Sequence, residues 1–168
     1  MIRIIVTLFL FFSFTLHATN FKANDLTFQD VQLLKQIKEY GQKYDLAYSL
    51  MAIAIKESSL GRYQVNVDSY DYGLYQANIN TVVKRHEVTN NAFNRNKLAM
   101  LLIKDFKFAT SNAIAELMFW KSVHGENWLR IWASYNAGFN YDSSRAIKYS
   151  NDIKAIISEL KNVEELNS

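Results

Sequence analysis

The chain has 168 residues, about half of them apolar, and a formal net charge of +3. That length suits one domain with a sizeable core, and the apolar content argues against a disordered chain. The absence of cysteine excludes disulfides, zinc–thiolate sites and thiol nucleophiles.

The first 18 residues have the pattern of an export signal. Arg3 supplies a positive charge, residues 4–16 form an apolar run, and Ala18 is a small residue suited to cleavage. The run is shorter than the about 20 apolar residues of a membrane span. We therefore expect a signal peptide over residues 1–18, an exported domain over residues 19–168 with no stable membrane insertion after cleavage, and a periplasmic location. The alternative is an uncleaved N-terminal anchor, as in a membrane-anchored helical adaptor.

Two helices are predicted in the first part of the chain after the signal pattern. Thr27 can cap a helix over residues 28–40 that Gly41 ends, and Asp45 can cap a second helix over residues 46–58. The second helix is apolar on almost every face, which is typical of a central, buried helix.

A loop with a small β-ribbon at residues 63–67 is predicted for residues 59–74, because glycine, asparagine and aspartate are frequent there. The remaining helices are predicted at residues 74–84, 94–106, 112–123 with Ser111 as the cap, 126–137, and from Ser143 or Ser144 to about 160, with a fraying end at 163–168. The predicted fold class is thus a mainly α single domain with one loop and β-ribbon region after the second helix.

Glu57 stands out at the end of the apolar helix. Its neighbours one and two turns back are apolar, so its carboxyl emerges from the packed side of the helix. A carboxyl held against an apolar wall can stay protonated near neutral pH, as an acid catalyst requires. The alternative is an ordinary exposed last turn.

Two further segments carry polar groups next to loops or helix ends. Gly73-Leu74-Tyr75-Gln76 follows the loop, and a glutamine amide can both donate to and accept from a sugar hydroxyl or an acetamido group. Tyr135-Asn136-Ala137-Gly138 ends a helix; Gly138 is typical of a C-cap, the Tyr135 hydroxyl can donate to a carboxylate, and Asn136 can hold an acetamido group. Taken singly, the first segment is better explained as an ordinary junction between loop and helix, and the second as an ordinary helix end.

In the order Glu-Ser, Gly-Leu-x-Gln and Tyr-Asn-Ala-Gly, the three segments resemble the lytic transglycosylases related to goose-type lysozyme. The resemblance covers roughly residues 44 to 150, and Asp71-Tyr72-Gly73-Leu74-Tyr75-Gln76 is similar to the small exported members that accompany secretion or conjugation machines. It implies a lysozyme-like fold, peptidoglycan glycan strands as substrate, and a secretion or conjugation apparatus as a candidate partner.

The resemblance also implies residue roles. Glu57 would be the catalytic acid and base, Ser58 would form a hydrogen bond near it, and Gln76, Tyr135 and Asn136 would orient substrate or catalyst. Tyr149 would match a further family tyrosine. The implied reaction cleaves the bond between N-acetylmuramic acid and N-acetylglucosamine and leaves 1,6-anhydro ends without consuming water.

Two alternatives remain open. Asp68 or Asp71, in the loop, can act as a base for water, which would make the protein an inverting lysozyme-type hydrolase. The domain can also be a non-catalytic wall-binding module of a secretion system.

Other classes have little support. His17, His86 and His124 are too scattered for a metal site, and no Ser/His/Asp hydrolase signature is present. We expect no metal and no cofactor. Lysine and arginine form no tract of the nucleic-acid-binding kind, so no nucleic acid partner is expected.

Overall fold

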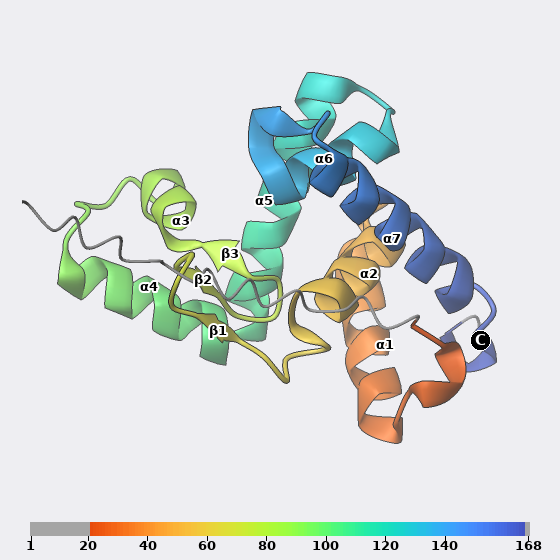
Figure 1. Ribbon diagram of the computed structural model, residues 1–168. Helices are drawn as coiled ribbons and strands as arrows, with labels where there is room; N and C mark the ends of the chain where they lie inside the picture. Colours follow the sequence, from red (N-terminus) through yellow and green to blue (C-terminus); the bar gives the residue numbers. More distant parts are fainter. Residues whose placement is uncertain (1–20, 167–168) are drawn as a thin grey trace, which may run out of the picture.

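The computed structural model describes residues 21–166, which form seven α-helices and a small three-stranded sheet (Figure 1). The helices are α1 (Phe28–Gln42), α2 (Ala47–Ser58), α3 (Ile79–Arg85), α4 (Ala92–Lys104), α5 (Phe106–His124), α6 (Trp128–Ala137) and α7 (Ser144–Leu160). The strands are β1 (Val65–Asn66), β2 (Asp71–Tyr72) and β3 (Ala77–Asn78), and short 3-10 helices span Ala23–Asp25, Gly138–Asn140 and Glu164–Leu166. The mainly α class with a small β region after α2 is confirmed. The predicted signal peptide lies outside the described residues.

Helix α2 is the centre of the larger part of the molecule. It packs against α1 on one side and α7 on the other (Figure 1). Its residues 49–54 are all buried, and Leu50, Met51 and Ile53 have no exposed surface. A helix that is apolar all round can be stable only inside such a shell, because each large apolar side chain gains roughly 1.5–3 kcal/mol on full burial.

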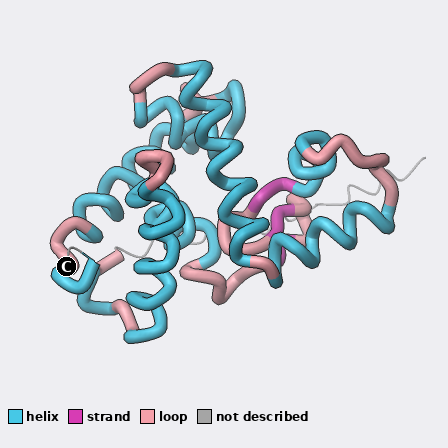
Figure 2. The backbone as a smooth tube through the Cα atoms, turned by 180° about the vertical axis from the view of Figure 1, so that it is seen from behind, coloured by secondary structure: helices cyan, strands magenta, loops and turns pink. Residues whose placement is uncertain are grey.

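A smaller part contains the sheet, α3 and α4, and it has an apolar cluster of its own: Ile79, Val82, Val83, Leu98 and Leu102. Helix α5 connects the two parts, since it packs against α4 at one end and α6 at the other (Figures 1 and 2). The loop between the strands also links them, because Leu74 and Tyr75 belong to the larger cluster.

The sheet is antiparallel in the order β1-β2-β3, and its register pairs Asp71 with Asn78. Both side chains therefore lie at one edge of the turn that carries Gln76. Asn78 donates a hydrogen bond from Nδ2 to Asp71 Oδ1 over 2.9 Å and also caps α3 by accepting from the Asn80 N–H over 3.1 Å. The sheet thus fixes the start of α3 relative to the loop.

Several helix boundaries follow the caps that the sequence contains. Thr27 caps α1, and Asp30 completes a capping box by accepting from the Thr27 N–H over 3.0 Å. Ser143 caps α7 and Gly138 ends α6, as predicted.

Other predicted boundaries are wrong. Gly41 does not end α1 but lies within it, where its lack of a side chain lets the Ala47 backbone approach. Asp45 does not cap α2, because its φ of 58° places it in the left-handed region and Leu46 holds the cap position.

The helix predicted over 74–84 begins only at Ile79, because residues 77–78 pair with β2 instead. Ser111 lies inside α5, which starts at Phe106 with Asp105 as its cap. Asp105 is both the C-cap of α4 and the N-cap of α5, so a single residue separates the two helices.

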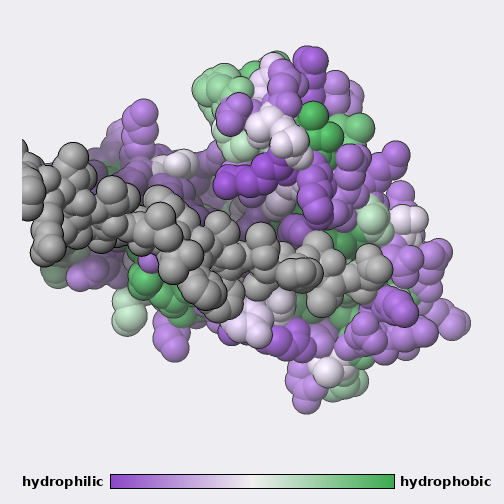
Figure 3. Space-filling view, in the orientation of Figure 1, coloured by the Kyte–Doolittle hydropathy of each residue, from purple (hydrophilic) through white to green (hydrophobic). Residues whose placement is uncertain are grey.

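The surface seen in Figure 3 is mainly hydrophilic, with apolar side chains in separate groups. The most exposed large apolar residues among those described include Phe28, Phe93 and Phe139, which lie on different elements. Within residues 21–166, none of the helices combines the length and apolar character that crossing a membrane would require.

Gly73 provides a test of this packing. Its φ is +82°, and a Cβ added there would lie 2.2 Å from the Leu102 carbonyl oxygen, whereas Gly125, with a φ of +61°, has open space around it. We expect Gly73→Ala to destabilise the protein by about 3 kcal/mol or more and Gly125→Ala by about 1–2 kcal/mol, since both introduce backbone strain but only the first displaces a helix backbone. Chemical denaturation measures both. Equal losses in the two variants would contradict the close approach of loop and α4.

Candidate active site

Glu57 lies in the last turn of α2, where the chain turns sharply away. Ser59, Leu60 and Gly61 all have positive φ, and the N–H groups of Ser59 and Leu60 bond to the Ile55 and Ala54 carbonyls over 3.0 Å each. This left-handed cap ends the helix immediately beyond Glu57. The carboxyl therefore leaves the buried helix at the edge of a cavity.

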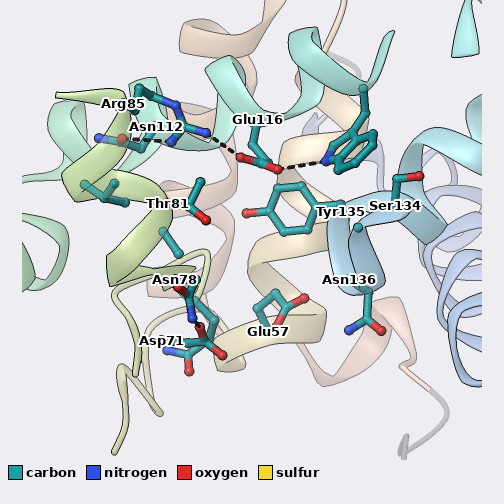
Figure 4. A pocket seen from close by; sticks show the side chains of 15 residues that line it. Glu57, Asp71, Asn78, Thr81, Arg85, Asn112, Glu116, Ser134, Tyr135 and Asn136 are labelled. Carbon is teal, nitrogen blue, oxygen red and sulfur yellow. Dashed lines mark hydrogen bonds and ion pairs between the residues drawn. The ribbon is translucent and has the colours of Figure 1, made fainter. Parts of the chain in front are cut away.

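The cavity has a volume of about 340 Å³ and is lined by side chains from α2, the sheet, α3, α5 and α6. In the view of Figure 4, Glu57 lies on the same side as Asp71 and Asn78, Arg85 and Glu116 lie across from it, and the ring of Tyr135 lies between. Gln76, Tyr135 and Asn136 all line this cavity with Glu57. The three sequence segments therefore meet at one place.

Tyr149 of α7 controls the environment of Glu57. Its hydroxyl donates a hydrogen bond to Glu57 Oε1 over 2.5 Å, and only 5% of the residue is exposed. Burial raises the pKa of Glu57 to about 7, the Tyr149 hydrogen bond opposes that rise, and the negative charge of Asp71 adds to it. Burial also holds the pKa of the Tyr149 hydroxyl well above its usual value, so the tyrosine remains a donor. Glu57 can thus give and take a proton near neutral pH.

Tyr135 has a different partner from the one the sequence suggested. Its hydroxyl donates to the Tyr75 carbonyl over 3.0 Å rather than to a carboxylate, and Tyr149 takes the place at Glu57. Tyr135 therefore ties α6 to the loop that carries Gln76. The family resemblance alone pointed to Tyr149.

Ser58 is also a structural tie. Only 1% of it is exposed; its hydroxyl donates to the Leu74 carbonyl over 2.7 Å and accepts from the Gly61 N–H over 2.8 Å. It is not among the residues that line the cavity. Its place in the fold is to hold the loop against the end of α2 beside Glu57, and a contact of Ser58 with substrate stays a prediction.

Gln76 and Asn136 present the groups suited to a ligand. Gln76 donates from Nε2 to the carbonyls of Gly73 and Tyr63, over 3.0 and 3.2 Å, so the amide is held in one orientation. Asn136 Oδ1 is buried and accepts no hydrogen bond from any of residues 21–166. A buried acceptor left without a partner costs about 1–3 kcal/mol, which a donor on a ligand would recover.

The two loop aspartates differ in position. Asp71 lines the cavity, where its carboxylate accepts from Ser69 Oγ over 2.6 Å and from Asn78 Nδ2 over 2.9 Å. Asp68 is exposed and is not part of the cavity lining. Of the two bases considered for a hydrolase, only Asp71 therefore faces the same space as Glu57.

A comparison with protein-family models identifies the chain. Residues 35–157 match the transglycosylase SLT domain. The chain belongs to the SLT transglycosylase family. Neither the comparison with curated proteins nor that with solved structures gave a significant match.

Membership of the SLT family confirms the resemblance drawn from the three segments, and it supports lytic transglycosylase activity on peptidoglycan. The lysozyme-like character of the mainly α fold agrees with it. The matched residues include every element that lines the cavity. The likeness to secretion- or conjugation-associated members stays a prediction.

Sequence reasoning missed the opposite wall of the SLT-domain cavity. Arg85 of α3 and Asn112, Glu116 and Trp120 of α5 line it. No short motif marks them, since Arg85 and Glu116 are 31 positions apart and meet only through tertiary packing. Within the described residues, no group of three or more His, Asp or Glu side chains could hold a metal ion.

The Tyr149 hydroxyl is expected to lower the pKa of Glu57. In Tyr149→Phe the hydrogen bond to the charged carboxylate is lost, so the pKa of Glu57 should rise by about one unit above its value in the native protein. A carbon-13 NMR titration of the glutamate side chains measures this shift. Tyr135→Phe is the matched control, because its hydroxyl bonds to a backbone carbonyl. A larger shift in the control than in Tyr149→Phe would contradict the assignment.

Proposed function

We propose that the protein cleaves the β-1,4 bond between N-acetylmuramic acid and N-acetylglucosamine in peptidoglycan, with Glu57 as the only acid and base. The observation that carries the proposal is the half-buried Glu57 carboxyl at the edge of the cavity, hydrogen-bonded to Tyr149, whose pKa of about 7 lets one residue serve both steps. The SLT family supports the substrate class and the reaction type.

In the first step, protonated Glu57 gives its proton to the glycosidic oxygen, and the bond from that oxygen to C1 of the muramoyl ring breaks. The acetamido oxygen of the same ring stabilises the positive charge that develops at C1. Asn136 Oδ1 is the acceptor we assign to the acetamido N–H, because it is buried in the cavity wall and accepts no hydrogen bond from the described residues. Gln76, held by Gly73 and Tyr63, lies on the same cavity.

In the second step, the Glu57 carboxylate takes the proton from the C6 hydroxyl of the muramoyl ring. The C6 oxygen then bonds to C1 and closes a 1,6-anhydro ring, while Glu57 returns to its protonated form. No water is consumed. The Tyr149 hydrogen bond supports this alternation, because it steadies the carboxylate that exists between the two proton transfers.

A second candidate is an inverting hydrolase with Asp71 as the base for water. It is favoured by one observation: Asp71 lines the same cavity as Glu57, and its charge raises the pKa of Glu57. Against it, both Asp71 oxygens already accept hydrogen bonds from Ser69 and Asn78.

The products released from purified peptidoglycan distinguish these reactions. We expect mass spectrometry to find muropeptides with 1,6-anhydro ends, each lighter by one water than the reducing-end product of a hydrolase. Glu57→Gln should lower the rate by at least about 100-fold, because the amide cannot donate or accept the proton. Asp71→Asn should still form anhydro ends.

Reducing ends that disappear in Asp71→Asn would instead establish the hydrolase. Equal clearing of the wall by the native protein and Glu57→Gln would overturn the acid assignment. Binding to sacculi without any cleavage would favour the wall-binding module.

We further propose that the protein acts in the periplasm, where peptidoglycan lies, after cleavage of residues 1–18, and that it serves a secretion or conjugation apparatus. The charged and apolar pattern of residues 1–18 supports the export step. Fractionation of cells and N-terminal sequencing of the soluble periplasmic chain should find a start near residue 19. A full-length chain retained in membranes after a carbonate wash would favour the anchor instead.

A further inference from the structure

A fixed arginine lies on the cavity wall that faces Glu57 in the view of Figure 4. Arg85 Nη1 donates to Asn112 Oδ1 over 3.1 Å, and its Nη2 forms an ion pair and hydrogen bond with Glu116. Glu116 accepts a second hydrogen bond from Trp120 Nε1 over 2.8 Å. The guanidinium is thus held in place from two turns of α5.

The hydrogen bonds of Arg85 and Glu116 indicate different roles for the two residues. Each oxygen of Glu116 already has a donor, one from a guanidinium and one from an indole. Glu116 is therefore suited to positioning Arg85 rather than to moving protons. Arg85, by contrast, has five N–H groups, of which two are used by Asn112 and Glu116. About a quarter of its side chain is exposed (24%), so a ligand can reach the rest.

The chemistry of the cavity indicates what Arg85 is for. Among the described residues that line it, Arg85 is the only cation, three are acidic (Glu57, Asp71 and Glu116), and the other polar groups are neutral, such as those of Gln76, Thr81 and Asn136. Neutral groups suffice for sugar hydroxyls and acetamido groups. The fork of a guanidinium matches a carboxylate, and charged hydrogen bonds of this kind are about twice as strong as neutral ones.

We propose that Arg85 binds a carboxylate of the peptide stem of peptidoglycan and so favours strands that carry stems, with Glu116 and Asn112 as its positioning residues. The proposal rests on the proposed function for its substrate class. The glycan backbone of that polymer offers hydroxyls and amides, whereas its peptide part carries carboxylates. A site that combines the amides of Gln76 and Asn136 with one oriented cation across the cavity from Glu57 fits both parts of the polymer.

The first test compares soluble glycan strands whose stems carry free carboxylates with the same strands after those carboxylates have been amidated. We expect Arg85→Gln to lower the ratio of kcat/KM on strands with free stem carboxylates to kcat/KM on strands with amidated stems by about tenfold, mainly through KM, since a charged hydrogen bond is lost. Arg85→Lys should give an intermediate ratio, because it keeps the charge and loses the fork. Arg130→Gln is the control, since Arg130 is exposed on α6, packs over Tyr141 and does not line the cavity.

The ratio compares two substrates on one protein, so a partly unfolded variant does not change it. The double variant Arg85→Gln/Glu116→Gln adds a check, because it leaves no unpaired carboxylate and should show the same fall. An unchanged ratio, including one that results from equal losses of kcat/KM on both kinds of strand, overturns the proposal. Arg85 and Glu116 would then contact the sugar or stabilise the fold.

The second test needs no catalysis. A synthetic stem tetrapeptide and its fully amidated counterpart are titrated by NMR into Glu57→Gln and into Glu57→Gln/Arg85→Gln. We expect the acidic peptide to bind Glu57→Gln about tenfold more tightly than the amidated one, and the Arg85 substitution to abolish that difference. Equal binding of the two peptides, or binding of neither, overturns the carboxylate site. If the native protein cleaves no strand at all, the proposed function fails while this titration still decides the role of Arg85.

Discussion

The hydrogen bond from Tyr149 to Glu57 is the interaction on which the candidate active site depends. It joins the end of α2 to α7, orients the Glu57 carboxyl, and lowers a pKa that burial raises. Burial alone would push that carboxyl toward permanent protonation, and full exposure would leave it permanently charged. A single donor placed 2.5 Å away holds it between these limits. The packing of the surrounding helices keeps the Tyr149 hydroxyl and the Glu57 carboxyl within hydrogen-bond distance.

Tyr149 and Glu57 are held together because the apolar helix α2 must be packed against other helices. Helix α2 can be stable only when α1 and α7 enclose it, and the same enclosure brings Tyr149 to Glu57. The loop after α2 is then tied from two sides: Ser58 bonds to the Leu74 carbonyl and Tyr135 bonds to the Tyr75 carbonyl. These adjacent carbonyls fix the turn that carries Gln76. Ser58 thus acts through the loop, whereas Tyr135 both holds the loop and lines the cavity.

Local patterns in the sequence identified much of this arrangement, because caps and apolar runs are properties of neighbouring residues. The capping box at Thr27 and the buried α2 are examples, and Glu57 could be singled out from its apolar neighbours alone. The start of α3 could not be predicted from the sequence, because residues 77–78 form a strand only through their pairing with β2. Arg85 and Glu116 were invisible for the same reason: they meet through tertiary packing between α3 and α5. The partner of Tyr135 is likewise decided by a backbone carbonyl that no side-chain pattern reveals.

The raised pKa of Glu57 lowers the free energy of unfolding at neutral pH. Its pKa is about 7 in the folded protein, against 4.5 for an unperturbed glutamate, so this group opposes folding wherever the unfolded chain would ionise more readily. The penalty is absent well below pH 4.5, grows as pH rises, and is complete above about pH 7. At working pH the surrounding core must therefore offset it. The dense apolar packing of α2 does so, and that same packing creates the desolvation which raises the pKa. Lower stability and the raised pKa of Glu57 are thus two consequences of one burial, and the Tyr149 hydrogen bond reduces the penalty while the pKa stays near 7.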